Sequence, residues 1–276
     1  MEWSKVKNII ILILLLVNGF LLVLVAAREG ESRRYRDSAL TQAVEVLERS
    51  GIQVDRAGLA DVDGLEPLQV DRDVEREGQL AAALLGEAVD GVDQGGGVYS
   101  YAGSLGRVEI RSGGALSAQL EDDPAWRAQD PAALARELLE RMGVEAVPEG
   151  QSLEQGSGTV SFRQSWQGAA LFSGRVEFTF EQGRLTGVEG ALLIQSPGRE
   201  EAAGGQPLTL PTALLRFLDG ILASGDVCSA VEGMEPGYLA SQSFSGSVQL
   251  SPAWKITTNM AAYYLNALTG ELTRAE

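Results

Sequence analysis

GRVEFTFEQGRLTGVEGALLI, the segment at residues 174–194, decides the fold. Apolar side chains occupy alternate positions in Arg175–Phe180, and Arg184–Ile194 is a second run rich in apolar residues. Alternation with a period of two is typical of a half-buried strand. The three residues Glu181-Gln182-Gly183 separate the runs, and a short connection with glycine favours a hairpin. The segment therefore predicts two antiparallel strands.

Related segments occur on both sides of this hairpin. Gly106–Ile110 reads GRVEI where Gly174–Phe178 reads GRVEF, and each is followed by a glycine-containing turn. Val176–Thr186 also aligns without gaps with Tyr263–Thr273, and both end in Gly-x-Leu-Thr. Internal similarity at intervals along a chain indicates a repeated structural unit. We expect three such units.

A helix is expected with each unit. Residues 33–50 carry an apolar stripe, Asp130-Pro131 supplies a favourable N-cap and first residue for a helix through Met142, and Ala213–Ala223 is a third candidate. Helices beside antiparallel strands define an α+β fold with a helix on one face of each sheet. The three expected units span residues 28–124, 125–206 and 207–276. The first includes the juxtamembrane helix, and the second ends in a linker, the polar segment Ser196–Pro207.

The first residues predict a single transmembrane helix. From residue 9 to residue 27 every side chain is apolar or small except Asn18. A helix of this length reaches roughly 28 Å, close to the ~30 Å hydrocarbon core of a bilayer. A cleaved signal peptide ending near Val25-Ala26-Ala27 is the alternative. The apolar run is longer than the roughly 7–15 residues of a signal peptide, which favours the uncleaved anchor.

The orientation of this helix rests on two opposing arguments. Lys5 and Lys7 precede the apolar run, whereas four arginines follow it between residues 28 and 36, which by charge count favours a cytoplasmic C-terminal side. A long acidic domain after a single N-terminal span is nonetheless usually exported. We therefore expect residues 1–8 as a short cytoplasmic tail and the large domain outside the cell membrane.

Composition excludes several classes of function. The chain of 276 residues has a formal net charge of −16, no histidine and one cysteine, Cys228. Nucleic acid is an unsuitable partner, because phosphate contacts need clustered Lys and Arg. The lack of histidine removes Ser-His-Asp and Cys-His catalysis and histidine metal sites. No Gly-Lys-Ser/Thr phosphate loop occurs. We expect no enzyme activity, no cofactor and no metal; a carboxylate pair of the glycosidase kind stays open as an alternative.

Six residues are candidates for partner binding. Asn18 and Gly19 interrupt the apolar run, where Asn seeks a hydrogen bond across helices and Gly lets a partner backbone approach closely. A tolerated polar residue is the alternative interpretation. Trp3 suits the lipid headgroup layer. The aromatic residues near the C-terminus either pack the last sheet or form an exposed recognition face; they are Trp254, Tyr263 and Tyr264.

Both ends of the chain resemble one family. The opening MEWSKVKNI at residues 1–9, followed by an aliphatic run with Asn18, resembles the start of YycI-type regulatory proteins. Residues 252–271, which read PAWKITTNMAAYYLNALTGE, look like the final hairpin of that family. YycI and YycH share this hairpin style, which is similar to PepSY-like modules. The chain departs from the family in being rich in Arg and Gly, nearly free of Lys and longer over residues 196–207.

The resemblance implies a fold and a function. The fold is a membrane anchor followed by PepSY-like units, and the function is a membrane-anchored, non-catalytic regulator in a two-component system. Members associate with YycH and with the WalK-type sensor histidine kinase that controls cell-wall homeostasis, so the implied partners are that kinase, a YycH-like protein and membrane lipid. One alternative is a stand-alone PepSY-like module that restrains a surface protease or binds a wall polymer or peptide at a sheet edge. Another is a wall hydrolase with convergent acids.

Overall fold

The structure is a computed structural model that describes residues 3–62, 64–194, 200–201, 205–242 and 247–275. Within these ranges the side chains of residues 3–10, 12–13, 22–33 and 200–201 lie outside the description. Most of the predicted linker Ser196–Pro207 and the side chain of Trp3 therefore lie outside the described residues.

Four helices and fifteen strands make up the described chain. The helices are α1 (Trp3–Arg49), α2 (Val74–Leu85), α3 (Pro131–Arg141) and α4 (Leu210–Ser224), and short 3-10 turns lie at Arg56–Gly58 and Pro124–Trp126. The strands are β1 (Gln53–Val54), β2 (Leu68–Val70), β3 (Val92–Gly95), β4 (Val98–Gly103), β5 (Gly106–Arg111), β6 (Ala115–Leu120), β7 (Ala146–Glu154), β8 (Ser157–Trp166), β9 (Ala169–Glu181), β10 (Arg184–Ala191), β11 (Glu200–Glu201), β12 (Ala230–Gln242), β13 (Val248–Thr258), β14 (Ala262–Asn266) and β15 (Leu272–Arg274).

Local signals in the sequence define several of these elements. The Asp130 side chain accepts hydrogen bonds from the backbone N–H groups of Ala132 and Ala133, so the predicted N-cap of α3 is confirmed. The predicted hairpin is confirmed as well, because β9 ends at Glu181, β10 begins at Arg184, and the two strands pair antiparallel across the turn between them. In both places the deciding interactions lie within a few residues of one another.

All fifteen strands of the described chain belong to one mixed sheet. Its main path runs β11-β2-β13-β12-β9-β10-β6-β5-β4-β3, and the remaining strands pair off this path. Two pairs are parallel. Gly237 and Tyr238 of β12 lie beside Ala170 and Leu171 of β9, and β1 lies parallel to the start of β12. The β9–β12 pair lies in the middle of the path and joins its two halves, β11 to β12 and β9 to β3.

The predicted fold class is wrong at the level of assembly. We expected repeated units, each with a helix on its own antiparallel sheet, whereas the chain forms one continuous mixed sheet with few helices. The reason is long-range pairing. β2 lies early in the chain but pairs with β13 near the end of the chain, and β6 pairs with β10. β9 begins at Ala169, and its first residues pair with β12.

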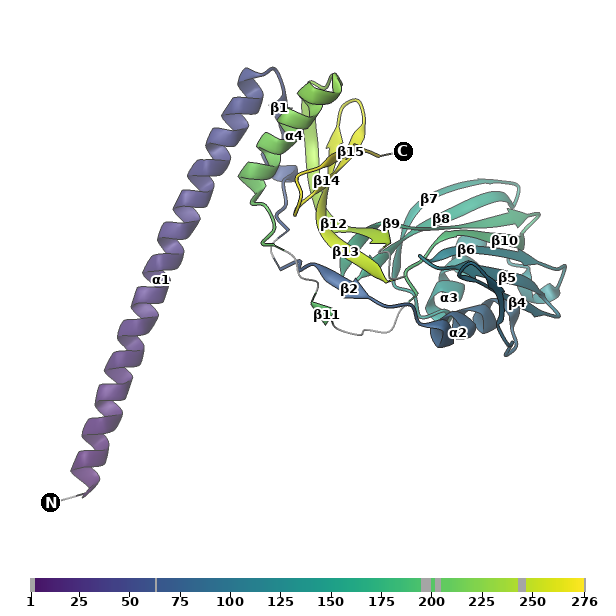
Figure 1. Ribbon diagram of the computed structural model, residues 1–276, viewed down its shortest axis with the longest axis horizontal. Coiled ribbons are helices and arrows are strands. Elements are labelled where there is room, and N and C mark those ends of the chain that lie inside the picture. Colours follow the sequence, from purple (N-terminus) through teal and green to yellow (C-terminus); the bar gives the residue numbers. More distant parts are fainter. Residues whose placement is uncertain (1–2, 63, 195–199, 202–204, 243–246, 276) are drawn as a thin grey trace.

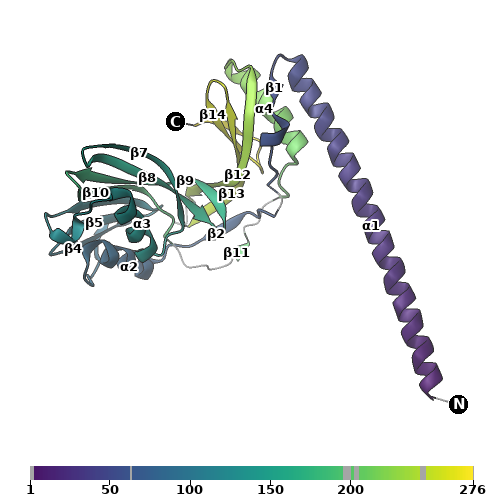
Figure 2. The same cartoon turned by 180° about the vertical axis from the view of Figure 1, so that it is seen from behind.

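The predicted transmembrane helix over residues 9–27 is also corrected. In the part of the chain that the structure describes, no helix meets the length and hydropathy needed to cross a membrane. Residues 9–27 instead belong to α1, which continues through the charged residues 28–37 and ends at Arg49. Gly51 follows with φ 87°, a backbone conformation that ends a helix and that glycine adopts without strain. Figure 1 shows most of α1 standing away from the other elements, and Figure 2 shows the same separation from behind.

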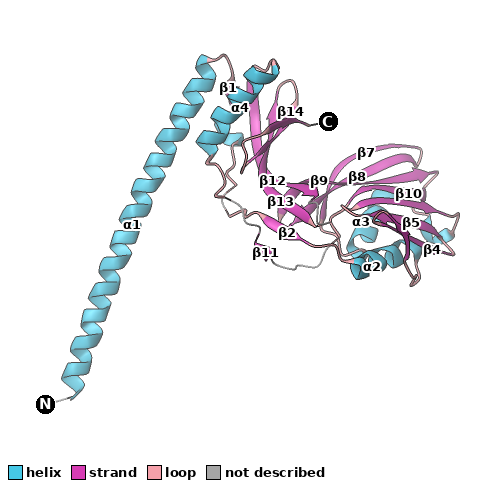
Figure 3. Ribbon diagram, viewed as in Figure 1, coloured by secondary structure: helices cyan, strands magenta, loops and turns pink. Residues whose placement is uncertain are grey.

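The buried residues form two large clusters and a small one between them. In the first, α2 and α3 pack on strands from β4 to β10. In the second, the C-terminal end of α1 and α4 pack on β12, β13 and β14. The third contains Leu171, Leu193 and Tyr238 where β9 meets β12. Figure 3 shows α2 and α3 together at one end of the sheet and α4 beside α1 at the other. This third cluster, called the junction cluster below, therefore lies between the two halves of the sheet.

Candidate functional site

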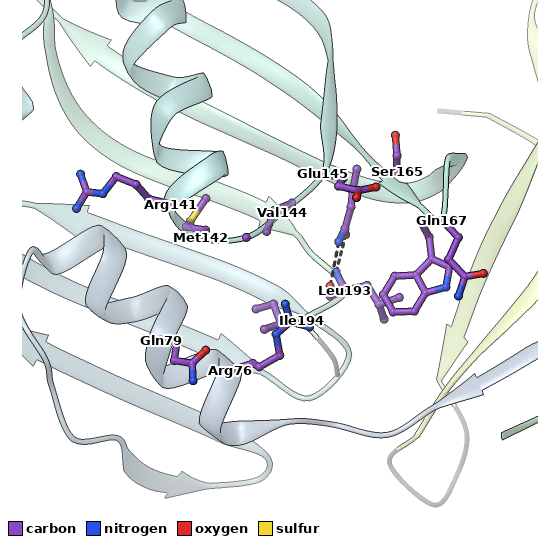
Figure 4. A pocket seen from close by; sticks show the side chains of 13 residues that line it. Arg76, Gln79, Arg141, Met142, Val144, Glu145, Ser165, Gln167, Leu193 and Ile194 are labelled. Atoms are coloured by element: carbon purple, nitrogen blue, oxygen red, sulfur yellow. Dashed lines mark hydrogen bonds between the residues drawn. The ribbon is translucent and has the colours of Figure 1, made fainter. Parts of the chain in front are cut away.

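A pocket of about 340 Å³ opens beside the junction of the two halves. Figure 4 shows the segments that surround it: α2, the end of α3 with the residues after it, the end of β8, and the residues after β10. Ligand pockets usually occupy roughly 300–1,000 Å³ and are lined mainly by apolar groups with a few polar ones. The apolar lining residues are Met142, Val144, Trp166, Leu193 and Ile194.

One buried glutamine, Gln164, holds one wall of the pocket in place. The Gln164 side chain donates from Nε2 to the Leu193 carbonyl at 2.9 Å, and its Oε1 accepts from the Leu193 N–H at 2.7 Å. Dashed lines mark these two bonds in Figure 4. Leu193 lies past the end of β10, and there the Gln164 side chain takes the place of the backbone hydrogen bonds of a neighbouring strand. The pocket wall formed by Leu193 is therefore fixed to the end of β8.

Two residues after Gln164, Trp166 lines the same pocket with an unpaired donor. Its Nε1 is buried and has no hydrogen-bond partner among the described residues. Tyr101 Oη and Trp126 Nε1 share that condition, but neither residue is among those that line this pocket. A buried donor without a partner costs free energy. Trp166 also contacts the junction cluster, so it touches both the pocket and the boundary between the halves.

Charged groups lie on the rim of the pocket. Arg141 is exposed and its Nη2 donates to the Ala83 carbonyl at 2.9 Å, near the end of α2. Arg76 is half-buried, and its Nη2 lies 3.7 Å from the position that a Cβ on Gly143 would take, just past the end of α3. Positive groups suit the negative ends of helix dipoles. Glu145 is the one carboxylate in the described lining, so the rim has an excess of one positive charge.

The candidates near the N-terminus lie on the free part of α1. Asn18 Nδ2 donates to the Leu14 carbonyl of its own helix at 2.9 Å, and the Asn18 side chain is exposed. Apart from the adjacent residues and the backbone of its own helix, a Cβ on Gly19 would have no atom of the described residues within 4 Å. Both positions are thus open to a partner.

The aromatic candidates lie elsewhere, inside the second half of the sheet. Trp254 is fully buried and its Nε1 donates to the Ala60 carbonyl at 2.9 Å. Tyr263 is buried and donates from Oη to Asp226 Oδ2 at 2.9 Å, and burial, then this bond, raises its pKa. Tyr264 is half-buried, with its ring stacked on Phe172 at 5.2 Å. The structure does not bring these residues together with Asn18 and Gly19, and Trp254 and Tyr263 pack the core.

The described residues also bear on the chemistry that the sequence left open. They contain no group of three or more Cys, Asp or Glu side chains placed to hold a metal ion. A hydrolase of the glycosidase kind needs two facing carboxylates, and the described lining of the pocket supplies Glu145 alone. Cys228 is buried, and burial, with a smaller contribution from Asp226, raises the pKa of its thiol, which disfavours the nucleophilic thiolate.

Sequence reasoning did not find the pocket. Trp166 is the last residue of β8, and Gln164 is an ordinary polar residue within the same strand. Their roles depend on Leu193, 29 positions from Gln164, and on a donor that is unpaired only in three dimensions. No local pattern carries that information.

Comparisons with known proteins give distant likenesses in structure. No protein-family profile matches the sequence, and no curated protein sequence is similar to it. An uncharacterized protein from Eubacterium rectale has a similar structure, with a TM-score of 0.47 and 10% identity over 82% of this chain and 90% of the other. The Bacillus megaterium YpeB C-terminal domain gives a TM-score of 0.39 and 13% identity over 75% of this chain and 99% of the domain. With TM-scores below 0.5, neither likeness defines the function of this chain.

Proposed function

We propose that this chain is a membrane-associated, non-catalytic regulatory protein that modulates a WalK-type sensor histidine kinase together with a YycH-like protein. The observation that carries the proposal is the continuity of α1, one helix from Trp3 to Arg49. A helix of this kind connects an apolar segment at one end with a buried core at the other. The resemblance of both chain ends to YycI-type proteins names the partners.

The apolar end of α1 needs apolar surroundings. Leu14, Leu15, Leu16 and Val17 are 55%, 66%, 66% and 49% exposed. Successive residues of a helix point about 100° apart, so these four side chains cover every side of it. A helix that is apolar all round is stable when lipid or protein surrounds it and not when water does. This supports attachment to a membrane.

The other end of α1 is part of the folded core. Ala43, Val44 and Leu47 are at most 3% exposed and belong to the same buried cluster as α4 and Trp254. Motion of the sheet is therefore transmitted to the helix, and motion of the helix to the sheet. A regulator changes a kinase only if it binds one kinase state better than the other, because equal affinity shifts no population. A rigid helix that ends in a packed domain offers a route to such a preference.

Co-purification from native membranes tests the proposal. The intact chain is compared with a variant in which an unrelated apolar segment of equal length replaces residues 9–27, and with the double variant Asn18→Leu/Gly19→Ile. We expect a sensor kinase to be recovered with the intact chain and to be reduced with both variants. Recovery of the kinase with none of the three, while the chain itself is abundant, would overturn the proposal.

A stand-alone binding module is the second candidate, and the pocket favours it. Such a module has no need of a particular membrane segment. Its activity would survive the exchange of residues 9–27 and would depend on the residues around Trp166 instead. The segment exchange therefore separates the two functions.

A further inference from the structure

We propose that the second part of strand β7, residues Gly150–Glu154, accepts an extended segment of another protein as an added antiparallel strand, with an aliphatic side chain in the groove between β7 and α3. The proposal concerns an interaction surface and holds whether or not the chain acts on a kinase. Three features carry it: the free backbone groups of β7, the lack of a blunting device in this part of the strand, and the groove beside it.

β7 is the one long strand at an edge of the described sheet. It pairs with β8 alone, and Figure 1 shows it on the outer side of β8. It has nine residues, whereas each of the other described strands with a single neighbour has at most four; these are β1, β3, β11 and β15. An edge strand presents unpaired N–H and C=O groups on which another chain can pair.

The turn between β7 and β8 sets the pattern of backbone bonds. Gln155 and Gly156 have φ 49° and 77°, the positive values of a type I′ turn, and Glu154 lies opposite Ser157 at the hairpin end. The pair that closes such a two-residue hairpin exchanges backbone hydrogen bonds. Bonded and non-bonded pairs then alternate along an antiparallel ladder.

This alternation leaves four backbone groups of β7 free. Gly150 faces β8, and its carbonyl also accepts a hydrogen bond from Ser161 Oγ at 3.3 Å. The N–H and C=O groups of Gln151 and Leu153 therefore point away from β8. No other described strand pairs with β7, so these groups are available to an added strand.

The devices that protect an edge lie in the first part of β7. Proline, bulges and charged side chains are the usual ones. Pro148 has no N–H, the ladder shifts register between Pro148 and Gly150, and Glu149 lies within this bulge. Residues 150–153 read Gly-Gln-Ser-Leu and contain neither a proline nor a charge. The edge is therefore blunted over residues 146–149 and open beyond them.

A groove lies beside the open part of the strand. It has a volume of about 240 Å³ and is lined by Ala132 of α3, by Gln151 of β7 and by the buried Val160 and Phe162 of β8, among others. Gln151 lies opposite Val160 in the ladder, so both side chains lie on the same face of the sheet. A residue of an added strand opposite Gln151 directs its side chain to this face as well. Since buried apolar residues line the groove, it suits an aliphatic side chain.

The charge at the groove favours an acidic neighbour. Arg136 lines the groove, is exposed and has no hydrogen-bond or ion-pair partner among the described residues. Glu149, the other charged residue of the lining, is engaged by Arg163 at 2.9 Å and by Arg175 at 3.4 Å. In an antiparallel added strand, the position two residues after the aliphatic one lies on the same face and toward the blunted part of β7. An acidic side chain fits there.

The occupant is a different protein rather than a second copy of this chain. Each chain carries a formal net charge of −16, and β7 itself contains Glu149 and Glu154 but no basic residue. Two copies paired along β7 would place like charges close together, which opposes association.

A short peptide provides the assay. The fluorescently labelled peptide Thr-Val-Thr-Leu-Thr-Asp-Thr, acetylated and amidated at its ends, places Val, Leu and Asp on one face, and its anisotropy is followed as the intact protein in detergent micelles is added. We expect saturable binding, weakened about tenfold when Leu is replaced by Ser and about threefold when Asp is replaced by Asn. N-methylation of the Leu nitrogen, which faces β7, should weaken binding about tenfold. N-methylation of the next Thr nitrogen, which faces away, should leave binding unchanged.

Protein variants assign the contacts. Gln151→Pro removes one outward N–H at an edge position that tolerates proline and should weaken binding about tenfold. Ala132→Phe fills the groove and should abolish the preference for the Leu peptide over the Ser peptide, and Arg136→Gln should abolish the preference for Asp over Asn. The matched controls are Ala133→Phe, the exposed neighbour on α3 outside the groove lining, and Arg107→Gln, an exposed arginine of β5. Because a preference compares two peptides on the same variant, it does not depend on the amount of folded protein.

Three results would overturn the proposal. The first is the absence of saturable binding of the Leu peptide. The second is an equal effect of the two N-methylations, which would mean that the peptide does not pair with β7. The third is a dimer of the intact chain in sedimentation analysis that Gln151→Pro dissociates, because a second copy would then occupy the edge.

Discussion

Truncation of one leucine tests how firmly α1 is joined to the folded core. Leu47 is fully buried in the cluster that contains α4 and Trp254. Leu47→Ala removes three carbon atoms, which at about 0.8 kcal/mol for each buried methylene is roughly 2.4 kcal/mol. The cavity left behind adds to this, and measured Leu→Ala costs lie between about 2 and 5 kcal/mol. We expect a loss of about 3 kcal/mol in the free energy of unfolding.

The neighbouring residue supplies the matched control. Val46 lies on the same turn of α1 and is 39% exposed. Val46→Ala should change the free energy of unfolding by less than about 1 kcal/mol, because partly exposed surface substitutions have small effects. Guanidinium denaturation of the full chain in micelles, followed by tryptophan fluorescence, measures both variants. Equal effects of the two substitutions would refute the reasoning, since they would mean that the end of α1 is not packed as described.

Three further predictions concern groups in the first half of the sheet. Gln164→Leu leaves the buried N–H and C=O of Leu193 unpaired and should cost roughly 2–5 kcal/mol of unfolding free energy, measured by denaturant titration; a loss below 1 kcal/mol would contradict the described role. Glu77→Gln removes the charge that pairs with Arg72 at 2.7 Å and should cost roughly 3–5 kcal/mol, seen as a lower denaturation midpoint, because Glu77 is 2% exposed and the guanidinium loses its counter-charge; an unchanged midpoint would contradict this. Burial, then the Glu77 charge, raises the pKa of Tyr101 from 10.0 to about 12. Between these pH values the folded state keeps a proton that the unfolded state releases, so the free energy of unfolding should fall as the pH rises from 10 to 12. Tyr101→Phe should reduce that fall when unfolding is measured across this range. An identical pH profile of the variant would count against it.

Local elements of the fold were predictable from the sequence. Asp130-Pro131 gave a correct N-cap because the bonds of the cap reach only two and three residues ahead. The β9–β10 hairpin followed from its alternating residues and its short turn. The global sheet was not predictable in this way. The parallel contact of Ala170 with Gly237 joins strands 67 positions apart, and no period or turn residue marks it.

The candidate site was less predictable than the fold. Its residues come from four segments between Arg76 and Ile194, and each is unremarkable in its own stretch of sequence. Trp254 and Tyr263 attracted attention as aromatic residues, and the structure places them in the core. Trp166 is half-buried with an unpaired indole N–H, whereas Trp254 is fully buried with a paired one, and both properties depend on how the whole chain folds.

A break in α1 tests most directly the claim that this helix transmits regulation. Gly30 lies within α1, between the apolar segment and the buried end. Gly30→Pro interrupts the helix at a cost of about 3 kcal/mol or more, whereas Gly30→Ala favours it. The measurement is autophosphorylation of the sensor kinase in reconstituted vesicles with each variant. The account predicts that the alanine variant changes kinase activity as the natural chain does and that the proline variant no longer does so. Equal effects of the two variants would contradict it.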